Sequence, residues 1–194
     1  MRKAADVGLL LMLLWIFSAS AYVLSFQPNS QASAQPNPPP NWCGGIVVSN
    51  QSIAEAVAHA HAMSSILPAT ISSSHFNVQY SPSDTTQSYA QKVSTSMEYA
   101  WTTEVINMQF REPWIAFWNL GKIPVYIKKD LNYLGVTYTI LGVGVTAIDI
   151  ATGMSDDQIA GVAVHEFFHA VQSSYDHTER DWIIEGTATW MVYK

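Results

Sequence analysis

Apolar residues recur along the chain with two different periods, and each period predicts one type of element. They recur every three or four residues in segment 51–67 and again in segment 89–108, which predicts two helices. Pro68 ends the first helix, and Asp84 and Gln87 have the spacing of a capping box before the second. The pattern therefore predicts a short amphipathic helix and a longer one that supports the core.

Strand patterns lie between these helices and continue after them. Segment 76–80 alternates apolar and polar residues, which is the period of a half-buried strand. Three short runs also have the pattern of strands, over 123–128, 136–140 and 146–150. Elements in this order predict an α+β fold, in which a small mixed or antiparallel sheet packs on the long helix and on a further helix described next.

Several local signals for the start of a helix coincide near Ser155. Ser155 and Gln158 have capping-box spacing, and Asp156 and Asp157 put negative charge in the first turn, where it interacts favourably with the helix dipole. A helix is therefore expected to begin here. Inside it lies the sequence HEFFH at residues 165–169, which has the HExxH pattern.

The spacing of this motif suits a zinc ion (Zn²⁺). Residues four apart lie on the same face of a helix one turn apart, so His165 and His169 can both direct a ring nitrogen at one ion, with Zn–N bonds of about 2.0–2.1 Å. Glu166 is rotated about 100° from His165 and projects beside the metal. There it can act as a general base, taking a proton from a metal-bound water.

A catalytic zinc site needs three protein ligands and one open position, so a third ligand is expected downstream. A histidine six residues after His169 with glycine at the third residue is one known solution, but Tyr175 and Gln172 occupy those positions. Glu185 is the better candidate, because it lies in the apolar stretch 181–191. A buried carboxylate there would need a partner, and a divalent cation provides one.

The surroundings of Glu185 fit a second helix. Asp181 has the position of its cap, and the small residues Gly186 and Ala188 would let it approach the HExxH helix closely. Glu179 is another nearby acid, but its polar neighbours indicate a solvated loop.

These segments resemble a known family. HEFFHAVQ followed by WIIEGTATWM is similar to the gluzincin group of zinc metallopeptidases, the thermolysin-like and aminopeptidase-like clan, and the pattern over 74–194 is similar to its secreted prokaryotic members. The resemblance implies a zinc-dependent endopeptidase with His165, His169 and Glu185 as ligands and Glu166 as general base. It also implies that strand 146–150 edges the cleft and pairs with an extended peptide or protein substrate.

The chain departs from the clan's pattern in two ways. Fifteen residues separate His169 from Glu185, fewer than in the best-known members. The chain ends at Lys194, nine residues after Glu185, whereas in the clan a later segment closes the cleft and supplies a tyrosine or histidine for the oxyanion. We therefore expect a C-terminally truncated catalytic domain.

The N-terminal part predicts export. Residues 1–26 combine a basic start with an apolar run over 7–26 and small residues, which is typical of a signal peptide or, uncleaved, of a membrane anchor. Residues 27–45 are rich in Pro, Asn, Gln and Ser and predict a linker, of which the part 27–42 is expected to be an extended spacer without chemistry. The catalytic domain is expected over 46–194, secreted or membrane-anchored and facing outside the cytoplasm.

Composition narrows the function further. Nine Lys and Arg against fifteen Asp and Glu give a net charge of −6, and the basic residues are scattered, which excludes the usual nucleic-acid binder. A single cysteine, Cys43, excludes an internal disulfide and any cysteine-rich metal site. Three roles remain open for it: a free thiol in the linker, half of a bridge to another chain or to a missing C-terminal region, or a latency ligand at the open position of the zinc.

The remaining histidines and aromatic residues have ordinary interpretations. His59, His61, His75 and His177 are expected to be surface, strand-edge or loop residues. Aromatic residues are more often core than pocket lining, so four of them are assigned to packing: Trp101, Trp114, Phe117 and Trp118.

The sequence thus favours zinc-dependent peptide-bond hydrolysis. The alternative from a different class is a non-catalytic exported surface or adhesion protein with a structural or vestigial zinc site. Hydrolysis of a non-peptide amide or ester by the same chemistry is a third possibility.

Overall fold

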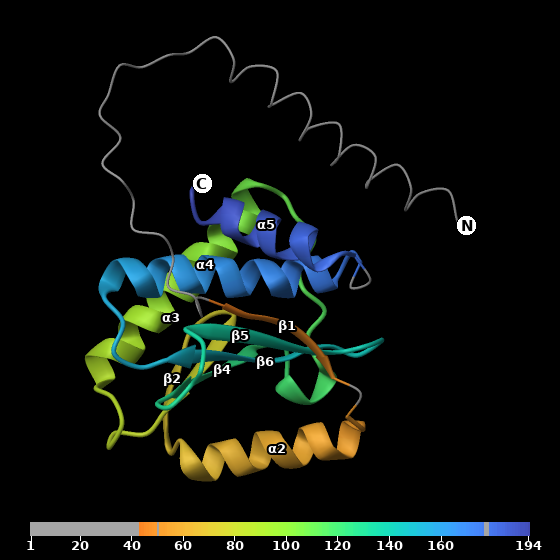
Figure 1. Ribbon diagram of the computed structural model, residues 1–194. Coiled ribbons are helices and arrows are strands. Elements are labelled where there is room, and N and C mark those ends of the chain that lie inside the picture. Colours follow the sequence, from red (N-terminus) through yellow and green to blue (C-terminus); the bar gives the residue numbers. More distant parts are fainter. Residues whose placement is uncertain (1–42, 50, 177–178) are drawn as a thin grey trace, which may run out of the picture. The chain divides into compact units, whose positions relative to one another are not determined.

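The computed structural model describes residues 43–49, 51–176 and 179–194 (Figure 1). The predicted signal or anchor segment 1–26 and most of the predicted linker lie outside the described residues. In the described part, no helix combines the length and the apolar character needed to cross a membrane. The elements, in chain order, are β1 (Cys43–Ser49), α2 (Ile53–Ile66), β2 (Ala69–Ser72), β3 (Phe76–Tyr80), α3 (Gln87–Trp101), the π-helix η2 (Thr102–Asn107), the 3-10 helix η3 (Phe117–Asn119), β4 (Ile123–Lys128), β5 (Gly135–Ile140), β6 (Gly144–Ala151), α4 (Asp156–Ser173) and α5 (Asp181–Met191).

The strands form one six-stranded sheet in the order β1-β5-β6-β4-β3-β2. The sheet is mixed: β5 runs antiparallel to β6 and β2 antiparallel to β3, whereas the pairs β1–β5, β6–β4 and β4–β3 are parallel. The predicted α+β fold with a mixed sheet is therefore confirmed.

The prediction that strand 146–150 edges the cleft is wrong. This segment belongs to β6, which is hydrogen-bonded to β5 on one side and to β4 on the other. Almost all of β6 is buried, as expected for a strand covered on both faces. The edge nearest to α4 is formed instead by β1, which pairs with β5.

Helices cover both faces of the sheet (Figure 1). On one face, Met63 of α2 and Leu67, which follows the helix, pack in one cluster with the buried ring of Tyr126 in β4. On the other face, α3 and α4 pack against each other and against the strands, and α5 packs on α4. The aromatic rings of Phe76 and Phe167 meet edge to face, at 5.6 Å between centroids, in the core between β3 and α4.

The capping box at the start of α4 is confirmed. Ser155 Oγ accepts a hydrogen bond from the backbone N–H of Gln158, and Gln158 Oε1 accepts one from the N–H of Ser155. Asp156 in the first turn also forms an ion pair with Lys92 of α3 at 2.6 Å. The helix that carries the HExxH motif therefore begins at the position that its local sequence predicts.

Two other predicted caps are wrong. Helix α3 is capped by Thr86, which accepts from the N–H of Tyr89. Asp84 instead forms an ion pair with Lys129 at 3.2 Å, so a tertiary contact takes its carboxylate away from the helix start. Asp181 is the first residue of α5 and not its cap.

The long helix differs from its predicted form at its C-terminal end. It is α-helical only to Trp101 and continues as the π-helix η2 to Asn107. The wider turn carries Glu104, whose side chain is completely buried and whose two carboxylate oxygens lack hydrogen bonds to any described residue. The uniform apolar period did not predict this change of helix type.

The packing role assigned to the four aromatic residues is only partly correct. Trp101 is buried, but Trp114 is 57% exposed and Phe117 is 70% exposed. Both exposed rings belong to the connection between η2 and β4. His59 and His61 are exposed on α2, as predicted.

Candidate metal centre

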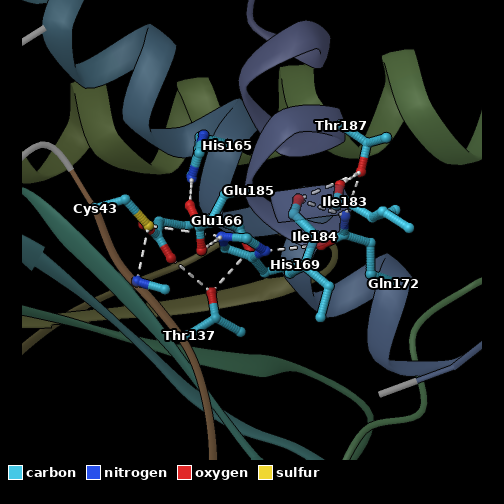
Figure 2. Close-up of polar contacts among 11 residues, drawn as sticks. Cys43, Thr137, His165, Glu166, His169, Gln172, Ile183, Ile184, Glu185 and Thr187 are labelled. Atoms are coloured by element: carbon cyan, nitrogen blue, oxygen red, sulfur yellow. Dashed lines mark hydrogen bonds and ion pairs between the residues drawn. The ribbon is translucent and has the colours of Figure 1, made fainter. Parts of the chain in front are cut away.

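Helix α4 brings His165 and His169 together, one turn apart and facing the same point (Figure 2). Their side chains are 1% and 0% exposed, and their ring centroids are 4.7 Å apart. Imidazole groups are rarely this deeply buried without a partner for each nitrogen. Neither ring nitrogen of His165 makes a hydrogen bond within the described part of the chain.

Glu185 reaches both histidines from α5. Its Oε1 lies 3.4 Å from His169 Nε2, and its Oε2 lies 3.4 Å from His165 Nε2. The carboxylate is 40% exposed, so it forms the solvent side of the cluster. The structure therefore brings together the three residues that the sequence analysis selected as ligands.

A fourth donor comes from β1. Cys43 Sγ lies 3.6 Å from His169 Nε2, and the four donor atoms of Cys43, His165, His169 and Glu185 all lie within 4.8 Å of one another. Cys43 falls in segment 27–45, which was predicted to be a linker, yet β1 begins at this residue. Its thiol is free, and pairing between β1 and β5 holds it at the site.

Two of the distances in the cluster have the values expected between two ligands of one zinc ion. Nitrogen and oxygen ligands with bonds of about 2.0–2.1 Å are about 3.4 Å apart across a tetrahedron, and a sulfur ligand with a bond of about 2.3 Å is about 3.6 Å from a nitrogen ligand. The distances from Glu185 Oε1 and from Cys43 Sγ to His169 Nε2 have these values, and the second oxygen of Glu185, Oε2, is the one that lies 3.4 Å from His165 Nε2. Nδ1 of buried His165 makes no hydrogen bond within the described residues, and its Nε2 has the ion pair with Glu185 but no hydrogen bond. The cluster could therefore hold a metal ion.

Charges within the cluster shift its pKa values. Burial tends to raise the pKa of Glu185, but the two facing histidines outweigh it and lower this pKa to about 2. For His169, burial tends to lower the pKa, and Glu185 and Glu166 outweigh it, so the pKa is raised. His169 and the carboxylate of Glu185 thus stabilise each other as an ion pair, and a bound cation can take the place of the histidine proton.

Glu166 lies beside the cluster and is completely buried. Its Oε1 accepts a hydrogen bond of 2.9 Å from the thiol of Cys43, and its Oε2 lies 2.9 Å from the hydroxyl of Thr137 in β5. Burial raises the pKa of Glu166, although the two histidines oppose this rise. A glutamate held in this way is suited to accept a proton.

Gly135 in β5 makes the close contact between the sheet and α4 possible. A Cβ atom at this position would lie 2.6 Å from Cγ of Glu166 and 2.7 Å from Cγ1 of Val162. Glycine is therefore required here by the approach of the general-base candidate to the strand.

Gln172, for which the sequence suggested no definite role, orients one histidine. Its Oε1 lies 2.7 Å from His169 Nδ1, and its amide nitrogen donates to Thr187 Oγ1 and to the carbonyl of Ile184. Because the amide nitrogen is engaged with two acceptors, Oε1 must accept from Nδ1–H, which leaves His169 Nε2 with a lone pair for a metal. Gln172 also ties α5 to α4.

The other candidate residues lie elsewhere. Glu179 is not part of the four-donor cluster, and His75 pairs with Glu98 of α3 at 2.7 Å. His177 lies outside the described residues. Sequence reasoning left a ligand role at the metal as one of three open roles for Cys43, and it did not place Thr137 or Gly135 at the site; the glycine beginning a strand was the one local signal of a close approach.

Comparisons of this chain with protein families, with curated proteins and with solved structures found no match. The centre is therefore interpreted from its own geometry and chemistry.

Proposed function

We propose that this chain hydrolyses peptide bonds with the help of a zinc ion held by His165, His169 and Glu185. The observation that carries the proposal is the convergence of these three donors beside the buried carboxylate of Glu166. Two histidines, one carboxylate and an adjacent glutamate are the groups that metal-assisted hydrolysis requires.

When bound, zinc would lower the pKa of a water molecule and polarise the scissile carbonyl. The protein groups supply the rest. Glu166 takes the proton from the attacking water and later delivers it to the leaving amine. Thr137 holds the Glu166 carboxylate, and Gln172 holds the ring of His169, so neither group must reorganise during the reaction.

The clan resemblance and the predicted N-terminal export segment complete the proposal. They support a gluzincin-like peptidase that acts outside the cytoplasm, secreted or anchored through residues 7–26, on peptide or protein substrates.

One observation favours the second candidate, a non-catalytic surface protein with a structural zinc site. Structural zinc sites are closed by four protein ligands, and Cys43 adds a fourth donor to the cluster. In that case, the metal would stabilise the junction of β1, α4 and α5 and would perform no chemistry.

Two substitutions separate these candidates, made in the wild-type chain and in a Cys43→Ala background. We expect one zinc per chain by elemental analysis, retained in Glu166→Gln and lost in Glu185→Ala, with Glu179→Ala as the control that keeps it. Hydrolysis of a fluorogenic peptide library should fall by about 10²–10⁴-fold in Glu166→Gln. Hydrolysis that survives the Glu166→Gln substitution would reject the proposed peptidase. The absence of hydrolysis in every zinc-loaded chain would reject it too.

A further inference from the structure

Strand β1 occupies the two places that a substrate of this site would need. Its first residue, Cys43, directs Sγ at the cluster, 2.9 Å from Glu166 Oε1 and 3.6 Å from His169 Nε2 (Figure 2). The rest of β1 pairs with β5, with Ile46 opposite Thr137, the residue that contacts Glu166. The strand therefore covers both the metal position and the sheet edge beside the general base.

The residues after Cys43 are shaped for this position. A Cβ atom on Gly44 would lie 2.9 Å from both Tyr133 and Val136, and one on Gly45 would lie 3.1 Å from Glu185 Oε1. Gly45 also has a φ of +75°, which favours glycine, and its N–H donates to Cys43 Sγ at 3.0 Å. The segment CGG thus fits against the site where residues with side chains would clash.

A second observation points independently to a metal at this position. His165 is 1% exposed, and neither of its ring nitrogens has a hydrogen bond within the described residues. Its Nε2 faces Glu185 within the same four-donor cluster that contains Cys43 Sγ. The thiol is therefore directed at a cluster in which buried His165 makes no hydrogen bond among the described residues and faces Glu185 only at the 3.4 Å of an ion pair.

We infer that Cys43 is a fourth, displaceable ligand of the metal and that β1 is a built-in inhibitor of the centre. This inference rests on the proposed function. On ligation the thiol loses its proton to solvent, and the sulfur takes the position that a water or substrate carbonyl would need. In the same state, β1 fills the edge of β5, to which an extended peptide could otherwise add as a strand. Dissociation of β1 from β5 would expose the metal position and the edge of β5 at the same time.

The full chain loaded with Co²⁺ tests the ligand directly. Cys43 is the single cysteine, so any thiolate-to-cobalt charge-transfer absorption in the near ultraviolet must come from it. We expect this absorption in the wild type, purified in detergent with a reductant, and its loss in Cys43→Ala with cobalt still bound. A wild-type chain that binds one cobalt without this absorption would overturn the inference.

The blocking role is tested by the access of a small ligand to the cobalt ion. If the thiol holds its position at least nine-tenths of the time, acetohydroxamate should bind the wild type at least about tenfold more weakly than Cys43→Ala. Gly44→Val keeps the thiol but disturbs the packing that positions it, so this variant should also bind acetohydroxamate more tightly than the wild type does. Equal acetohydroxamate affinity in wild type and Cys43→Ala, with circular dichroism showing both folded, would contradict the block.

These readouts do not depend on catalysis, so the two proposals can fail separately. If the charge-transfer band and the weaker acetohydroxamate binding are found but no zinc-loaded chain cleaves peptides, the inference on Cys43 holds and the proposed peptidase fails. If Cys43→Ala and the wild type cleave peptides equally and the band is absent, the peptidase holds and the inference fails.

Discussion

His169 Nδ1 lies 2.7 Å from Oε1 of Gln172, one helical turn further along α4. The amide of Gln172 donates in turn to Thr187 and to the Ile184 carbonyl on α5, so the orientation of one candidate ligand is coupled to the docking of the helix that carries another (Figure 2). Such outer contacts fix the tautomer and the direction of a ligating histidine.

Gln172→Leu should therefore lower zinc affinity by about 10–100-fold, because His169 loses the acceptor that orients it. Gln172→Glu keeps an acceptor at the same place and should largely restore affinity. Thr187→Val is the matched control, since it removes one of the two hydrogen bonds from the Gln172 amide to α5 and leaves the bond to His169. Competition with a chromophoric chelator measures all four chains. An equal loss in Gln172→Leu and Thr187→Val would assign the effect to helix docking instead.

Gly135→Ala should destabilise the protein and disturb the site together. The new methyl group would lie 2.6 Å from Cγ of Glu166 and 2.7 Å from Cγ1 of Val162, and overpacking of this kind costs about 1–3 kcal/mol. Gly186→Ala is the contrasting control: nothing lies within 4 Å of its new methyl group, and a helix interior favours alanine by about 0.5–1 kcal/mol. Urea unfolding of both variants gives the two changes, which should have opposite signs.

Glu104 should make stability depend on pH. Burial without a partner among the described residues raises the pKa of its carboxyl well above the ordinary value of 4.5. Between these two pKa values the folded state binds a proton that the unfolded state has lost, so the free energy of unfolding falls as pH rises through that window. The contribution of Glu104 to the free energy of unfolding is fully present below pH 4.5 and is lost as pH rises through the folded-state pKa of this carboxyl.

Glu104→Gln removes this titration. The difference in unfolding free energy, variant minus wild type, should therefore increase from pH 5 to pH 8, as measured by urea unfolding at several pH values. Glu98→Gln is an informative counterpart, because the pKa of Glu98 is shifted in the other direction. Burial tends to raise this pKa, but contacts with Ser73 and His75 outweigh burial and lower it. Glu98→Gln should therefore reduce the free energy of unfolding at pH values above the ordinary pKa of 4.5. A flat difference for Glu104→Gln would show that its carboxyl is solvated in the folded state.

The sequence by itself determined the features that depend on neighbours along the chain. The start of α4 followed from Ser155 and Gln158, which satisfy each other's backbone groups within one turn. The common direction of His165 and His169 followed from the geometry of any α-helix. Strands β3 and β4 were found at their observed bounds because their period and length are local properties.

Only the tertiary structure decided which distant groups meet. The carboxylate of Asp84 pairs with Lys129 instead of capping α3, and Cys43 contacts Glu166, which lies 123 positions further along the sequence. β6 lies inside the sheet because β5 pairs on its other side, and β1 then adds to the edge of β5. Strand order and register depend on non-local hydrogen bonds and on close contacts such as that of Gly135 with Glu166, and no local period encodes either.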